Sequence, residues 1–213
     1  MDNNELWSSV VNTLSIEAKS ISDLSGSVSR EAVTDLIKLI GDCRGRIVLA
    51  GCGTSAAAAK KIAHSLCCVE RPAAYLNPAD AVHGALGFLQ KEDIFILISK
   101  GGNTREILSM IPACKTKGST LVAVTENPDS VLAREADILL KIKAEKEPCP
   151  FNMLATASTL VVIAIFDAIC IALMNYTNYT REQFAVIHPG GAVGDRLLRA
   201  KNEEGAWEKI WKQ

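Results

Sequence analysis

The chain has 213 residues, of which 48% are hydrophobic and 5% aromatic, and its formal net charge is −1. A chain of this length fits one domain and can bury a core without disulfides or metals. Because the charge is close to zero, no broad basic face is expected, which argues against nucleic acid and anionic membranes as partners.

Apolar residues at helical spacing predict two helices in an N-terminal region, 4–42, within 4–24 and 27–40. Five short apolar runs then alternate with helical segments, which is typical of a parallel sheet with right-handed crossovers. The predicted strands are 46–50, 73–76, 93–98, 119–125 and 138–142. The helices predicted between them are 54–68, 104–117 and 130–135.

Long helices are expected to close the chain. The apolar run 160–174 is shorter than the ~20 residues that span a bilayer, and Asp167 lies in its middle. We therefore expect a central helix or one in a subunit interface, not a membrane span. The short tail 200–213 places Trp207 and Trp211 on one helix face, where they could dock on this subunit or a neighbour.

The cysteines and the N-terminal residues indicate the cellular compartment of the protein. Seven cysteines, an odd number with no CxxC pair, indicate buried thiols in a reducing compartment. The first residues lack the basic start and apolar run of a signal peptide. A cytoplasmic protein is expected. Neither HExxH nor CxxC is present, so no metal site is expected.

Two glycine-rich loops follow predicted strands. The first, GCGTS, offers Gly53, Thr54 and Ser55 at a helix start, and the second, SKGGNT, spans 99–104. Free N–H groups and hydroxyls in such loops bind anions. The second loop could instead be an ordinary turn in which Asn103 or Thr104 caps a helix. Two such loops at one edge of a parallel sheet favour the anion site.

Three further segments carry candidate groups. Glu147 lies in a proline-bounded loop before hydroxyls at the start of the apolar helix, although a lone glutamate is usually a solvated carboxylate. His188 precedes a Pro-Gly-Gly turn, where histidine is more often structural than catalytic. Asp80 and His83 could share a helix face.

These segments together resemble the sugar isomerase (SIS) domain family, and the arabinose-5-phosphate isomerase branch most closely. The resemblance rests on GCGTS, NPADAVHGALG, SKGGNTREIL, VTENPDSVLAREAD, KEPCP followed by ATAST, and FAVIHPGGAVG, which cover roughly 46–198 in the family's order. The E-x-CP and HPGGA-G segments are the more specific to that branch.

The resemblance implies a single SIS domain over 1–213 with a flavodoxin-like α/β fold: a five-stranded parallel sheet with helices on both faces. It also implies a homotetramer whose sites form between subunits. The implied reaction interconverts D-arabinose 5-phosphate and D-ribulose 5-phosphate through an enediol, without metal or cofactor. The implied groups for binding the sugar phosphate are Gly53, Thr54, Ser55, Ser99, Lys100, Gly101, Gly102, Asn103, Thr104, Ser158 and Thr159.

The residues that match the family's proton-transfer positions are Glu147, His83 and His188. A base must move a proton between C2 and C1, which suits a carboxylate such as Glu147. Ring opening and proton shifts between oxygens suit a histidine, and either one could serve. Two alternatives remain open: a binding module that senses a sugar phosphate without turnover, or an isomerase of a different sugar phosphate.

Three positions depart from the branch. Thr54 stands where lysine is usual, Gly101 where serine is usual, and Ala85 where aspartate is usual. We hypothesise that Lys100 supplies the cation that Thr54 does not. Longer relatives carry paired CBS modules after this domain, and that regulation is not expected here because the sequence ends soon after Leu198.

Overall fold

A computed structural model describes residues 1–190 and 194, and the predicted tail with Trp207 and Trp211 lies outside these residues. Five parallel strands form one sheet in the order β2-β1-β3-β4-β5. The strands are β1 (Ile47–Gly51), β2 (Ala73–Tyr75), β3 (Ile94–Ile98), β4 (Thr120–Thr125) and β5 (Ile138–Lys141). This order is that of flavodoxin-like doubly wound folds, so the predicted sheet is confirmed.

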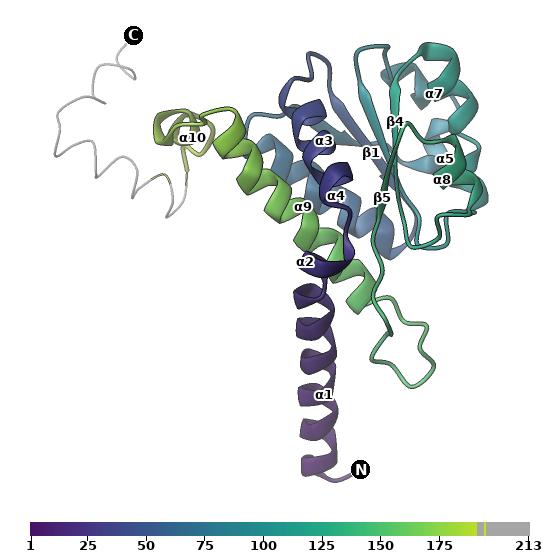
Figure 1. Cartoon of the computed structure of the whole chain (residues 1–213), viewed down its shortest axis with the longest axis vertical. Coiled ribbons are helices and arrows are strands. Elements are labelled where there is room, and N and C mark those ends of the chain that lie inside the picture. Colours follow the sequence, from purple (N-terminus) through teal and green to yellow (C-terminus); the bar gives the residue numbers. More distant parts are fainter. Residues whose placement is uncertain (191–193, 195–213) are drawn as a thin grey trace, which may run out of the picture.

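Helices cover both faces of the sheet (Figure 1). One face packs against α3 (Arg30–Gly41), α4 (Thr54–Cys67) and α9 (Ala157–Tyr176). The other carries shorter elements: α5 (Pro78–Ala81), η1 (Ala85–Phe88), α6 (Arg105–Leu108), α7 (Ile111–Lys117) and α8 (Val131–Glu135). The remaining described helices are α1 (Asn3–Ser22), α2 (Leu24–Ser27) and α10 (Arg181–Ile187).

Alternation along the strands builds two cores. In β3, Ile94, Ile96 and Ile98 face α4 and α9, whereas Phe95 and Leu97 face the opposite layer. All five residues are buried, as expected of a strand with helices on both sides. This two-sided burial explains why the strands are continuous apolar runs and could be located from sequence.

The predicted helix 104–117 was wrong as a single element. The structure contains two helices there, α6 and α7, with Ser109 and Met110 between them. Pro112 lies in the first turn of α7. Proline has no N–H to donate and its ring excludes the carbonyl of the preceding turn, so it begins a helix rather than continuing one.

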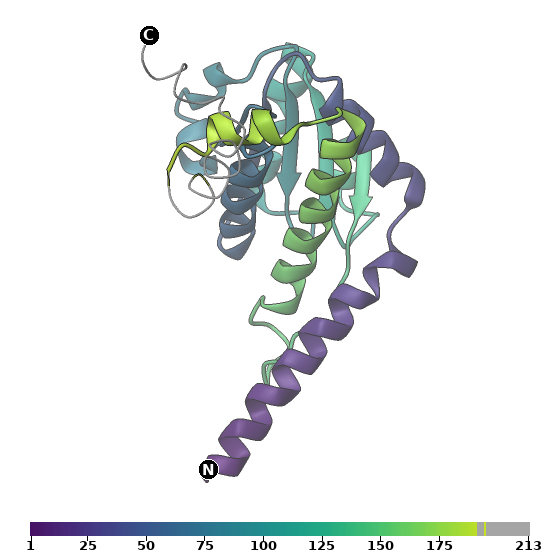
Figure 2. The same ribbon diagram turned by 90° about the vertical axis from the view of Figure 1, so that its left-hand side faces the viewer.

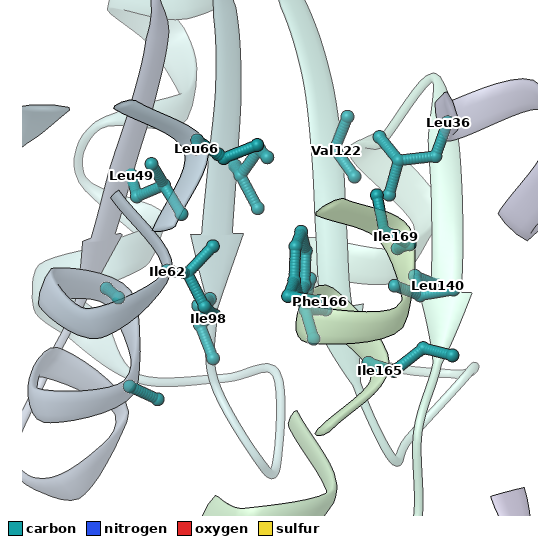
Figure 3. Packing of buried hydrophobic residues seen from close by; sticks show 14 of the residues in the cluster. Leu36, Leu49, Ile62, Leu66, Ile98, Val122, Leu140, Ile165, Phe166 and Ile169 are labelled. Carbon is teal, nitrogen blue, oxygen red and sulfur yellow. The ribbon is translucent and has the colours of Figure 1, made fainter. Parts of the chain in front are cut away.

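Helix α9 is long and apolar enough to cross a membrane by length and composition. It packs instead against α1, α3 and α4, with Val161, Phe166 and Ile169 buried in the core. Figure 3 shows Phe166 among side chains from α4 and the sheet. Asp167 forms an ion pair with Lys61 of α4, which accounts for the charge in an otherwise apolar helix.

Helix α1 extends away from the sheet, as the two views in Figures 1 and 2 show. Asp2 begins it with a capping box: its side chain accepts from backbone N–H groups, and Glu5 reaches back to the cap. Large apolar side chains along α1 are exposed: Leu6, Trp7, Val10, Val11, Leu14 and Ile21. An exposed patch of this kind marks an interaction surface.

Asp93 ties the amino ends of β1 and β3 together. Its side chain is 2% exposed and accepts hydrogen bonds from the Arg46 backbone N–H at 2.7 Å, the Arg46 guanidinium and the Gln90 N–H at 2.8 Å. Burial alone would raise the pKa of Asp93, but these hydrogen bonds outweigh it and lower the pKa.

An Asp93→Asn substitution is therefore expected to lower the free energy of unfolding at neutral pH by about 1.5–3 kcal/mol, the range for hydrogen bonds to a charged group. Because the folded pKa lies below the unfolded one, this contribution is present above pH ~4 and is lost as the pH falls through the folded value. Thermal melts of both proteins from neutral to acid pH should show the difference in Tm shrinking below that pH. A difference that stays constant with pH would contradict the role assigned to the Asp93 charge.

Candidate active site

A pocket of about 450 Å³, counting the open solvent at its mouth, lies where the carboxyl ends of the central strands meet the first turns of α4 and α9. This is the edge at which doubly wound sheets bind ligands. Its lining residues are Thr54, Ser55, Ala58, Ile98, Lys100, Val124, Thr125, Glu126, Ile142, Ala155, Ser158, Thr159 and Val162.

The first glycine-rich loop reaches this pocket. Gly53 precedes α4 with a φ of +57°, a left-handed value that favours glycine. The turn places Thr54 and Ser55 in the first turn of α4, and both line the pocket. The hydroxyl of Thr54 therefore lines the pocket at the position where the resemblance would place lysine.

The second glycine-rich loop is largely bonded to itself. The Ser99 and Thr104 hydroxyls lie 2.8 Å apart, and the Gly102 N–H donates to Ser99 Oγ at 3.1 Å. Thr104 precedes α6 without a side-chain capping bond, and Asn103 Oδ1 accepts from the Val131 N–H. Of residues 99–104, only Lys100 lines the pocket. An anion in this pocket would thus meet the lysine rather than the loop's hydroxyls.

Glu147 is a buried carboxylate with a full set of partners, not a solvated loop residue. Its side chain is 1% exposed. Oε1 accepts from Lys100 Nζ at 2.8 Å, and Oε2 accepts from the backbone N–H groups of Thr156 at 3.0 Å and Ser158 at 3.3 Å. The carboxylate thus binds the N-terminal end of α9, where a negative charge is favoured.

The same contacts set the acidity of Glu147. Burial alone would raise its pKa, but hydrogen bonds from Lys100 and from the first turn of α9 outweigh burial and lower the pKa. The loop is held in place by Asn152 Oδ1, which accepts from the Glu147 N–H at 2.7 Å. Cys149 Sγ adds to this by accepting N–H bonds from Met153 and Leu154.

Neither candidate histidine lines the pocket. His83 is exposed in the turn after α5. His188 follows α10, where its ring stacks on Phe184 and its Nδ1 lies 2.9 Å from the Phe184 carbonyl oxygen. Glu147 and α10 lie at opposite ends of α9, whose 20 residues span roughly 30 Å (Figure 1). One chain therefore brings Lys100 to Glu147 and places His188 beyond the other end of α9.

Sequence reasoning missed several residues of the site. Thr125 and Glu126 line the pocket at the end of β4, and their signal was available: they follow a predicted strand at the same edge of the sheet. Asn152 and Cys149, which hold the Glu147 loop, gave no such signal because their contacts are made within an irregular loop.

A parallel sheet in this order, with a polar pocket at its carboxyl edge, defines a ligand-binding domain of the doubly wound α/β class. More particularly, the chain belongs to the SIS domain family, whose sequence pattern matches residues 39–172.

Relatives of known name are similar over most of the chain. The arabinose 5-phosphate isomerase KpsF of Escherichia coli O6:H1 strain CFT073 is 37% identical over 193 residues, which is 91% of this chain; the chain spans 59% of the length of that relative. The c3406 protein of E. coli CFT073, solved in complex with arabinose 5-phosphate, is 31% identical with a TM-score of 0.85, covering 89% of this chain and 100% of the other.

A second similar structure is a candidate sugar-phosphate isomerase from Listeria monocytogenes strain 4b F2365. It is 61% identical with a TM-score of 0.88, and the match covers 89% of this chain and 100% of that one. The resemblance to isomerases of the SIS family seen in the motifs is thus confirmed over most of the chain.

Proposed function

We propose that this protein is an aldose–ketose isomerase that interconverts D-arabinose 5-phosphate and D-ribulose 5-phosphate through an enediol. The observation that carries the proposal is Glu147, a buried carboxylate paired with a lysine that lines the pocket, in a chain similar to arabinose 5-phosphate isomerases. A sensor of sugar phosphates would need the pocket but no buried base.

In this proposal Glu147 is the general base. It takes the proton from C2 of the open-chain aldose and returns it to C1 of the enediol, so no net proton is consumed. Lys100 and the hydroxyls of Thr54, Ser55, Ser158 and Thr159 bind the sugar phosphate, since all of these line the pocket. Gly53 and the remaining residues of the 99–104 loop do not line the pocket; in this proposal they hold the backbone of the two loops that carry Thr54, Ser55 and Lys100.

We propose that His83 and His188 act in a site completed by another subunit of a homotetramer. Within one chain His188 is separated from Glu147 by the length of α9, so a neighbouring copy is the simplest source of a histidine. The exposed apolar stripe of α1 supports association, because a stripe of this kind is normally covered.

The test of the function is a coupled assay of the purified protein with arabinose 5-phosphate, in which ribulose 5-phosphate is detected, next to a panel of other pentose and hexose phosphates. Turnover of arabinose 5-phosphate is expected. Turnover of only another sugar phosphate of the panel would change the proposed substrate but not the proposed isomerase reaction. Binding without turnover across the panel would contradict the proposal and identify a sensor.

The oligomer makes a separate prediction. Light scattering on a sizing column should give the mass of a tetramer, and Val10→Asp with Leu14→Asp should reduce that mass, because both side chains lie in the exposed apolar stripe of α1. The matched control is Ser8→Asp with Asn12→Asp on the opposite side of the same helix, which should leave the mass unchanged. A monomeric parent, or an unaltered mass in the first variant, would contradict the proposed assembly.

A further inference from the structure

Lys100 lies between the carboxylate of Glu147 and the pocket, and its ammonium can bind an anion on either side. Its Nζ lies 2.8 Å from Glu147 Oε1, and its side chain also lines the pocket. The lysine side chain is 41% exposed, whereas that of Glu147 is 1% exposed. An ammonium has three donors, and the hydrogen bond to Glu147 uses one of them. Lys100 thus faces a buried carboxylate on one side and the solvent of the pocket on the other.

Glu147 does not depend on Lys100 for its position. Its other oxygen, Oε2, is held by the N–H groups of Thr156 and Ser158, and its own N–H is bonded to Asn152. These contacts are made by backbone N–H groups at the start of α9 and by a side chain of the same loop. The lysine, on a flexible four-carbon stem, is the partner that is free to move.

Lys100 is the cation near Glu147 that an anion in the pocket would meet, as the other nearby charges show. Of the residues that line the pocket, Lys100 and Glu126 are the charged ones. On the loop that carries Glu147, Glu145 pairs with Lys143 at the surface, and Lys146 is exposed. A dianion entering the pocket would therefore meet Lys100 as its nearest lining cation.

We propose that the phosphate of the substrate draws Lys100 away from Glu147 and thereby turns the carboxylate into an effective base. This inference rests on the function proposed above and adds to it a regulation of the same site. The dianion carries twice the charge of the carboxylate, and it is reached by an ammonium that is already half exposed. No atom changes its bonding in this step except through hydrogen bonds.

The consequence for catalysis follows from what the lysine does to the carboxylate. While Lys100 is bound, hydrogen bonding outweighs burial and the pKa of Glu147 is lowered, so the carboxylate is a weak base. Without Lys100, burial and the nearby dianion both act to raise that pKa. A general base works best with a pKa near the working pH. A sugar that lacks the phosphate would thus meet the weaker base.

The test uses NMR of the full chain labelled with ¹³C at the glutamate carboxyls, with the Glu147 signal assigned by its absence from Glu147→Gln. Its titration is followed in sodium chloride and in sodium sulfate at equal ionic strength, since sulfate remains a dianion throughout. In the parent, sulfate should raise the pKa of Glu147. In Lys100→Met the pKa should already be raised in chloride, and the effect of sulfate should be largely lost. Lys91→Met, before the opposite end of β3, should behave as the parent.

A second measurement covers the case in which Lys100→Met fails to fold. In the parent, the ¹⁵N signal of Lys100 Nζ should follow the titration of Glu147 in chloride and cease to follow it in sulfate. Two results would overturn the proposal: no change of the Glu147 pKa in sulfate, or an equal rise in Lys100→Met, which would show a field effect of the anion alone. Both readouts are independent of turnover. A protein that turns over no sugar phosphate of the panel would therefore refute the isomerase, while the role of Lys100 would still be decided.

Discussion

Replacing Glu147 by glutamine is expected to lower kcat for arabinose 5-phosphate by about 10²–10⁴-fold, the usual contribution of a general base. Glutamine keeps the shape of the side chain and an oxygen that can accept from the N–H groups of Thr156 and Ser158. It cannot take a proton from C2. The substitution therefore removes the proposed chemistry and leaves the loop in place.

Binding should survive the same substitution. Lys100 loses its carboxylate partner but is 41% exposed, so water or the substrate phosphate can satisfy it. The dissociation constant for the sugar phosphate, measured by calorimetry, is expected to stay within a few-fold of the parent or to tighten. A loss in kcat with binding retained is the signature of an interaction used only in the reaction.

The matched control for this prediction is Glu126→Gln. Glu126 is the other carboxylate at the pocket, but it is partly exposed at the end of β4 and its backbone N–H bonds to the Lys100 carbonyl. Its substitution should alter kcat far less than that of Glu147. If Glu147→Gln kept full turnover while Glu126→Gln lost it, the base would have to be reassigned to Glu126.

The sheet was predictable because its strands are buried on both faces. Runs such as 93–98 are apolar without interruption, and flanking glycines and helical spacing mark where each ends. The carboxyl-edge location of the pocket followed from the same pattern. The prediction of one helix over 104–117 was wrong. The helical spacing of apolar residues continues across Pro112, but the backbone forms two separate helices, α6 and α7.

The partners of Glu147 could not be predicted from the sequence. A lone glutamate in a loop is usually solvated, and only the tertiary packing brings Lys100, 47 residues away, to the side of Glu147. The position of His188 relative to Glu147 was equally hidden, because it depends on how α9 and α10 follow the loop that carries Glu147. Spacing in sequence fixes neighbours along a helix or strand, but not the meeting of two loops.

Gly102 is the residue of the second loop whose substitution should destabilise the protein most. Its φ of +69° lies in the left-handed region, and a Cβ there would collide with the Ser130 side chain and approach Thr125 Oγ1 at 3.0 Å. Gly102→Ala should lower the free energy of unfolding by about 2–5 kcal/mol, from the left-handed backbone and the overpacking together. Urea unfolding at a fixed protein concentration measures this.

The neighbouring glycine provides the control for this last prediction. Gly101 has no positive φ, and nothing lies within 4 Å of a Cβ built on it, so Gly101→Ala should change stability by no more than about 0.5 kcal/mol. Because the Lys100 carbonyl is bonded to Thr125 Oγ1, displacing Thr125 in Gly102→Ala should also disturb Lys100. Equal stabilities of the two variants would show that the loop relaxes around a Cβ, and the tight packing of Gly102 would then not be what positions Lys100.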